Sequence, residues 1–99
     1  MQFRLTDAGC SPATLSLDAG RTTFTVTNAG TGRVSELELL SGARVLGEKE
    51  NLVAGLSGSF TLTLQPGRYT LSCPGGTTAA TGVLTVGGAR VAPTTDPRP

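Results

Sequence analysis

The sequence contains no histidine and no tryptophan, and its aromatic side chains are one tyrosine and three phenylalanines. Without histidine the chain cannot build a Ser-His-Asp or Cys-His catalytic centre, and most zinc sites are excluded as well. The same absence excludes a blue-copper centre, which needs two histidines and one cysteine around the metal. Any metal chemistry of this chain therefore depends on cysteines and carboxylates.

Charge and long apolar runs are also scarce. Charged residues make up 15% of the 99 residues and the net charge is +1, which gives no reason to expect nucleic acid or an anionic membrane as a partner. No apolar run approaches the ~20 residues of a membrane helix, so no membrane span is expected. Residues 2–5 after Met1 show no apolar signal region. The length suits one domain with one core.

What the sequence has in abundance is glycine, which with proline interrupts the chain at nearly regular intervals. Between the breaks, apolar residues alternate with polar ones: Phe24 and Val26 share one parity, and threonines occupy the other. This period of two is typical of strands with one buried face, and such even spacing predicts an all-β sandwich or barrel of about eight strands. The predicted strands are 2–7, 13–17, 21–28, 34–40, 43–47, 58–64, 67–73 and 82–86.

Two segments fall outside this pattern. Residues 48–52 give a weak indication of a helical turn. Residues 87–99 carry three prolines among the last seven and have no apolar periodicity. We therefore expect a domain over 1–86 and a Pro/Gly-rich linker or disordered tail over 87–99.

All glutamates fall within 15 residues, in two pairs spaced by two. In an extended chain both carboxylates of a pair leave the same face. Two such pairs on neighbouring segments could form a site for a hard cation, which prefers oxygen ligands. The simpler alternative is a solvated strand face, with Lys49 and nearby arginines as partners for the carboxylates. The residues are Glu36, Glu38, Glu48 and Glu50.

Cys10 and Cys73 are the only cysteines. Joined as a disulfide, they would stabilise the fold by roughly 4 kcal/mol on the chain-entropy model. As thiolates, with a glutamate, they would instead provide ligands for copper, zinc or iron. The separation of the two residues in the sequence leaves both alternatives open.

Several motifs together resemble the N-terminal cupredoxin-like domain of EfeO-type bacterial iron-uptake proteins, over about residues 3–86. The Glu-x-Glu and Glu-x-Glu-Asn motifs and the order of the two cysteines make the resemblance fairly specific. The motifs are Gly9-Cys10-Ser11-Pro12, 19–28, Glu36-Leu37-Glu38-Leu39-Leu40, 45–52 and 65–73.

The resemblance implies a cupredoxin-like Greek-key β-sandwich with a periplasmic or extracytoplasmic role in iron uptake. It implies a copper or iron ion held by Cys10, Cys73 and Glu36, with Glu38, Glu48 and Glu50 as candidates for a second, harder site. It also implies a helical, peptidase-like domain or an iron permease as a partner.

Two functions follow from these residues. The first is a metal-binding domain for copper or iron, linked to iron uptake and without a blue-copper centre. The second is a disulfide-stapled structural or docking module, without a metal of its own, that orients a neighbouring domain or binds a permease. We do not expect an enzyme, because no nucleophile and base are visible together.

Overall fold

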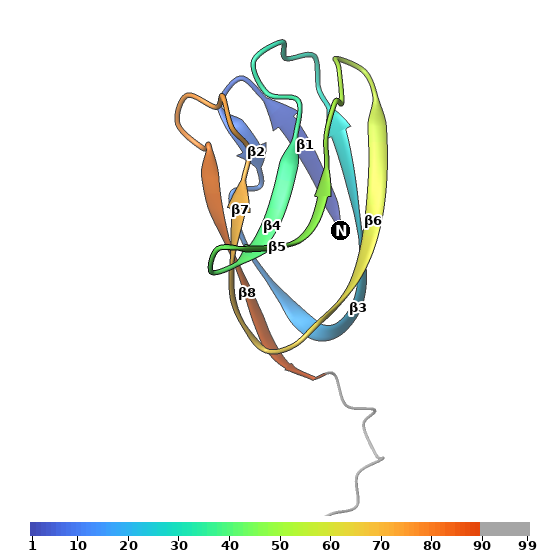
Figure 1. The fold of residues 1–99 in the computed structure, drawn as a ribbon, viewed down its shortest axis with the longest axis vertical. Coiled ribbons are helices and arrows are strands. Elements are labelled where there is room, and N and C mark those ends of the chain that lie inside the picture. Colours follow the sequence, from blue (N-terminus) through green and yellow to red (C-terminus); the bar gives the residue numbers. More distant parts are fainter. Residues whose placement is uncertain (90–99) are drawn as a thin grey trace, which may run out of the picture.

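The computed structural model describes residues 1–89, and residues 90–99 lie outside the described part. The described residues form eight strands and no helix, so the predicted all-β sandwich is confirmed (Figure 1). The strands are β1 (Gln2–Thr6), β2 (Gly9–Ser11), β3 (Thr14–Asn28), β4 (Leu37–Ser41), β5 (Arg44–Lys49), β6 (Ser57–Leu64), β7 (Gly67–Ser72) and β8 (Thr81–Ala89).

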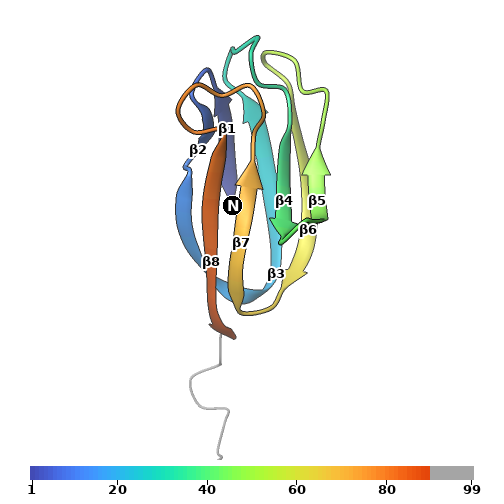
Figure 2. The same ribbon diagram turned by 60° about the vertical axis from the view of Figure 1, so that its left-hand side comes forward.

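The strands form two layers that share β3. Sheet A contains β2, β1, the second half of β3, and β6. Sheet B contains the first half of β3, then β8, β7, β4 and β5. Figure 2 shows β8, β7, β4 and β5 side by side across sheet B. β5 is therefore an edge strand, hydrogen-bonded only to β4.

β3 spans Thr14–Asn28 as one strand of 15 residues, where the sequence predicts two strands on either side of residues 18–20. A register shift between Leu17 and Ala19, followed by Gly20 with φ 129°, bends the strand at this point. A bend of this kind lets one strand pass from one packed sheet to the other. The glycine therefore turns the strand without ending it, which the sequence pattern could not distinguish from a loop.

Two further predictions differ from the structure. β2 was not predicted, because three residues are too few to show an alternating pattern. The helical turn expected at 48–52 is wrong: β5 continues to Lys49, and Asn51 then takes a left-handed conformation with φ 57°.

The boundary between domain and tail also differs. β8 runs to Ala89, where it pairs with Ala19, so the first residues of the segment expected as a linker, 87–99, belong to the sheet. The rest of that predicted linker, 90–99, lies outside the described residues.

The core lies between the two sheets. The Phe24 ring stacks on Phe3 with ring centroids 5.9 Å apart and on Phe60 at 5.3 Å. The predicted alternation holds in β1, β4 and the second half of β3, where one parity is buried and the other is more exposed. Fully buried side chains include Phe3, Leu5, Phe24, Leu37, Leu39, Leu64, Leu71, Cys73 and Leu84.

Glycine allows β5 to lie close to β6 across the edge of the sandwich. A Cβ atom added to Gly47 would lie 2.7 Å from a ring carbon of Phe60. A Cβ atom added to Gly58 would lie 3.1 Å from the Lys49 Cδ. The aliphatic stem of Lys49 therefore lies over Gly58 and points towards β6.

Candidate functional site

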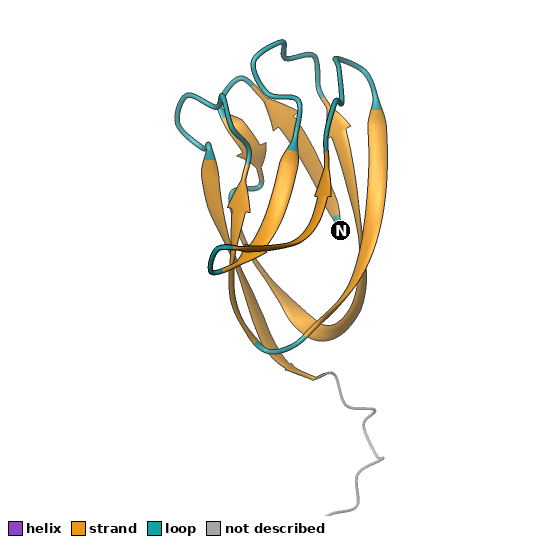
Figure 3. Ribbon diagram, viewed as in Figure 1, coloured by secondary structure: helices purple, strands orange, loops and turns teal. Residues whose placement is uncertain are grey.

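Loops from both sheets gather at one end of the sandwich, away from the bend in β3 (Figure 3). A disulfide joins the two sheets at this end. Cys10 lies in β2 of sheet A and Cys73 follows β7 of sheet B, with Cα atoms 5.7 Å apart. Their relative exposures are 3% and 0%, so the bond is buried. The loops that meet here are 7–8, 29–36, 50–56 and 73–80.

The disulfide is further held by the backbone of the 73–80 loop. The Cys10 amide donates to the carbonyl of Ala79 at 3.0 Å, and the Cys73 amide donates to the carbonyl of Ala80 at 2.7 Å. Gly9 has φ 130°, and a Cβ there would lie 1.9 Å from the Ala79 carbonyl oxygen, so only glycine allows this close approach.

Of the two alternatives for the cysteines, the disulfide is confirmed. Metal binding by cysteine requires the thiolate. In this structure each sulfur is bonded to the other, so neither is a free thiolate ligand for copper or iron.

A buried asparagine at the end of β3 organises the loops beside the disulfide. Asn28 is 2% exposed. Its Nδ2 donates to the carbonyls of Thr31, Val34 and Leu52 at 3.0, 3.1 and 2.8 Å. Its Oδ1 accepts from the amides of Gly30 and Thr31, both at 2.8 Å. One side chain thus satisfies backbone groups that the 29–36 and 50–56 loops would otherwise bury unpaired.

A second chain of hydrogen bonds extends from Asn28 to the remaining loops. The Thr31 hydroxyl donates to the carboxylate of Asp7 and accepts from the Arg33 amide. The Arg33 Nε donates to the carbonyl of Gly75 at 3.3 Å. Together with the disulfide, these contacts connect all four loops. Sequence analysis missed Asn28, although an asparagine before Ala-Gly at a strand end is a known signal for a side-chain-capped turn.

The structure brings together one pair of the predicted glutamates. Glu38 of β4 lies directly opposite Glu48 of β5 in the strand register. Glu36 immediately precedes β4 and Glu50 immediately follows β5, so both lie at the same end of this hairpin. Glu48 and Glu50 are exposed, whereas Glu36 and Glu38 are half-buried.

Glu38 and Cys73 face opposite sides of sheet B. Glu38 is paired with Ser72, and both alternate with buried neighbours. Cys73, the next residue, faces the core. Within residues 1–89 no group of three or more His, Cys, Asp or Glu is placed to hold a metal ion. The mixed set of Cys10, Cys73 and Glu36 is therefore not assembled here.

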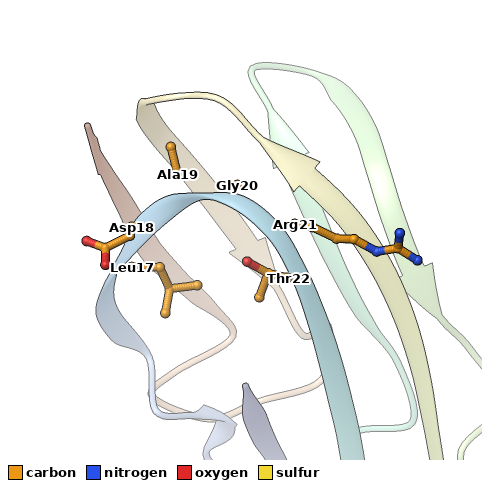
Figure 4. Close-up of a pocket in the computed structure, with 6 residues that line it drawn as sticks. All are labelled: Leu17, Asp18, Ala19, Gly20, Arg21 and Thr22. Carbon is orange, nitrogen blue, oxygen red and sulfur yellow. The ribbon is translucent and has the colours of Figure 1, made fainter. Parts of the chain in front are cut away.

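Two hollows beside the bend in β3 contain none of these glutamates or cysteines, and one of them, of about 460 Å³, is lined by Ser16, Leu17, Asp18, Thr85 and Gly87. The other, a concave region of about 310 Å³, follows the inside of the bend in β3. It is lined by Leu17–Thr22 alone, and Figure 4 shows the side chains of Asp18 and Arg21 pointing away from each other. It offers no set of polar groups directed at one point, which a ligand site requires.

A blue-copper ion does not fit these residues. Such a centre needs two imidazoles and a thiolate. The chain has no histidine, and both cysteine sulfurs are in the disulfide. We therefore assign no step to a copper ion of this type.

Comparison with known sequences places the chain in a family. The sequence model of the family described as "Cupredoxin-like domain" matches residues 1–86. The chain belongs to the cupredoxin-like domain family. Within that family it is of the EfeO type: it is 39% identical over 73 residues to the iron uptake system component EfeO of Escherichia coli strain K12 and of Shigella flexneri. The match covers 74% of this chain and 19% of either relative, so this cupredoxin-like chain spans about a fifth of their length.

Solved structures confirm the cupredoxin-like fold. Auracyanin B superposes with a TM-score of 0.73 at 21% identity, covering 87% of this chain and 86% of auracyanin B. Dithionite-reduced auracyanin from the photosynthetic bacterium Roseiflexus castenholzii gives a TM-score of 0.68 at 16% identity, covering 86% and 94%. At these identities the likeness concerns the fold alone. Among the residues that the structure describes, no helix is long and apolar enough to cross a membrane.

Truncating the Asn28 side chain is expected to lower the stability of the domain strongly. Asn28→Ala leaves several buried backbone groups without a partner, and we expect the free energy of unfolding to fall by about 3 kcal/mol. Thr23→Ala is the control, because it removes only an exposed hydroxyl bond to Thr61, and we expect it to change stability by less than about 0.5 kcal/mol. Urea denaturation measures both. Equal losses in the two variants would show that Asn28 does not organise the loops.

Removing one charge of the Glu38–Glu48 pair is expected to raise stability. Like charges directly opposite each other on neighbouring strands destabilise a sheet. We expect Glu48→Gln to raise the free energy of unfolding by about 0.5 kcal/mol at low ionic strength, and the gain to vanish in about 1 M salt. Glu50→Gln is the matched control, because Glu50 lies outside the strand pairing. Thermal unfolding in both salt conditions measures the difference, and identical gains in the two variants would contradict direct repulsion.

Proposed function

We propose that this cupredoxin-like chain is an extracytoplasmic module of an iron-uptake protein of the EfeO type. It acts there as a rigid, disulfide-stapled docking element that orients a neighbouring domain or binds a permease, and it catalyses no reaction itself. The disulfide between the only two cysteines carries the proposal, because it uses the sole thiols for structure.

The disulfide also supports an extracytoplasmic location. Such bonds form and persist in oxidising environments such as the periplasm and are rare in the cytosol. The bond joins residues 63 apart in the sequence, and its loss from a small domain costs roughly 4 kcal/mol on the chain-entropy model. That is a large part of the ~5–15 kcal/mol stability of a typical domain.

A domain exchange tests this function. In Escherichia coli K12 EfeO, the region that matches this chain is replaced by residues 1–89, and uptake of radiolabelled iron is measured in cells that lack the native protein. We expect the chimera to restore uptake. We expect a Cys10→Ser/Cys73→Ser chimera to restore less, because the fold loses its staple.

Two controls make the exchange specific. The first replaces the same region by auracyanin B, which shares the fold at 21% identity, and we expect it not to restore uptake. The second is alkylation of the unfolded, unreduced chimera isolated from the periplasm, which should modify neither cysteine. Failure of the chimera, with the protein present in the periplasm at the native level, would contradict the proposed function.

Cation binding by the carboxylates is a second candidate function. Glu38 and Glu48 lie opposite each other with Glu36 and Glu50 at the same end of the hairpin. Oxygen ligands suit Fe(III) better than copper in its lower oxidation state. Iron held here would be cargo of the uptake system, bound at the surface of sheet B.

Calorimetric titration tests this candidate. The native protein is titrated with Fe(III) citrate and with Cu(II), and so are Glu48→Ala and Glu36→Ala. If the carboxylates bind iron, we expect at least a tenfold weaker affinity in the variants and an unchanged thermal unfolding profile. Identical titrations in native and variant proteins would exclude a carboxylate site.

A further inference from the structure

The outward surface of sheet B carries a row of three aliphatic side chains and one threonine beside the glutamate pair. Leu40 of β4 is paired in register with Val45 of β5 on one side and with Thr70 of β7 on the other. Thr70 is in turn paired with Val83 of β8. Since paired residues share a face of the sheet, the row crosses four strands. Val45 is 42% exposed, one of the most exposed large apolar side chains among the described residues.

The glutamate pair forms the next row on the same face. Glu38 and Leu40 lie two residues apart on β4, so their side chains leave the sheet on one side. Glu48 is opposite Glu38. We call this surface the acidic–apolar face. Its residues are Glu38, Leu40, Val45, Glu48, Thr70 and Val83.

The carboxylates of this face are not paired with the cation that shares it: Arg68 lies on the outward parity of β7, four residues from the Ser72 that pairs with Glu38. No ion pair joins Glu38 or Glu48 to any residue of 1–89. Lys49, the nearest cation in sequence, is paired with the buried Leu37 and lies over Gly58 on the inner side. The expected pairing with Lys49 is therefore absent, and two like charges stay opposed beside exposed aliphatic groups.

The outward face of sheet A shows that this is not a general property of the domain. There the exposed side chains satisfy one another across the strands. Thr23 and Thr61 hydroxyls are 2.8 Å apart, and Thr27 and Ser57 hydroxyls are 2.7 Å apart. That face carries no carboxylate on β3 or β6. Among the described strand pairs, carboxylates face each other only between β4 and β5.

We propose that the acidic–apolar face docks a protein surface on which Lys or Arg side chains surround an apolar side chain. This inference rests on the docking function proposed above. It assigns that function to one surface of the chain and specifies the chemistry of the partner. Cations of the partner would neutralise Glu38 and Glu48, while its apolar group would cover Leu40 and Val45. An apolar centre with a charged rim is the usual composition of a protein interface, and complementary charge increases the association rate.

The test uses defined peptides as probes of the 99-residue chain, observed by chemical shifts of the ¹⁵N-labelled protein at 0.15 M salt. The first peptide alternates Lys and Leu, the second has equal charge with Ser in place of Leu, and the third alternates Glu and Leu. We expect saturable shifts confined to β4, β5 and β7 with the first peptide, at least fivefold weaker binding of the second, and none of the third.

Variants locate the binding. We expect Glu38→Gln/Glu48→Gln to weaken binding of the Lys-Leu peptide at least tenfold, and Val45→Ser to weaken it several-fold. Ser59→Lys/Thr63→Lys is the matched control, because it changes the net charge equally on the exposed face of β6 in sheet A. It should leave the affinity within twofold, since charges beyond ~8 Å are screened at this salt concentration.

Three outcomes would overturn the proposal: shifts spread over both sheets, equal binding of the Lys-Ser peptide, or equal loss in the two double variants. Saturable shifts of Glu38 and Glu48 with Ca²⁺ but not with the Lys-Leu peptide would also overturn it, in favour of a cation site. The two proposals can be tested separately. If the chimera still restores iron uptake when it carries Glu38→Gln/Glu48→Gln, this face is not the docking surface, but the proposed docking function stands. An inactive chimera rejects the function.

Discussion

The covalent bond between Cys10 and Cys73 fixes the end of the sandwich at which the loops meet. It joins β2 of sheet A to the end of β7 in sheet B, and both sulfurs are buried. The Asn28 side chain then connects the 29–36 and 50–56 loops through five hydrogen bonds. Bond and network act at the same end, and among the described residues no buried side-chain nitrogen or oxygen lacks a hydrogen-bond partner.

This arrangement leaves no thiolate for a metal at the end where the loops meet. The fold places side chains from several loops close together, which in a protein with histidine and free cysteine suits a metal. Here the same end is filled by a disulfide and by an asparagine whose side-chain atoms are all hydrogen-bonded. Glu38 and Glu48, on the outer surface of sheet B, have no ion-pair partner among residues 1–89. The surface that we propose for docking is therefore the outer side of sheet B.

Part of the fold could be predicted because it depends on short-range periodicity. Phe24 and Val26 are buried and Leu37 and Leu39 alternate with glutamates, as a period of two requires. The bend in β3 could not be predicted, because Gly20 has the same sequence signature whether a strand bends or ends. β2 was missed because its pairing with β1 depends on a partner strand rather than on its own three residues.

For the candidate site, the sequence by itself determined what is impossible. The absence of histidine excludes a blue-copper centre in any fold, because no arrangement of the chain can supply a ligand that it does not contain. It also determined that Glu38 and Leu37 leave opposite faces, since neighbours in a strand alternate. Only the tertiary structure decided that the sulfurs meet and that Glu38 opposes Glu48, because both depend on pairing between segments distant in the chain. The same long-range pairing placed Glu38 beside Ser72, so the Glu38 side chain leaves sheet B on the side opposite the buried Cys73.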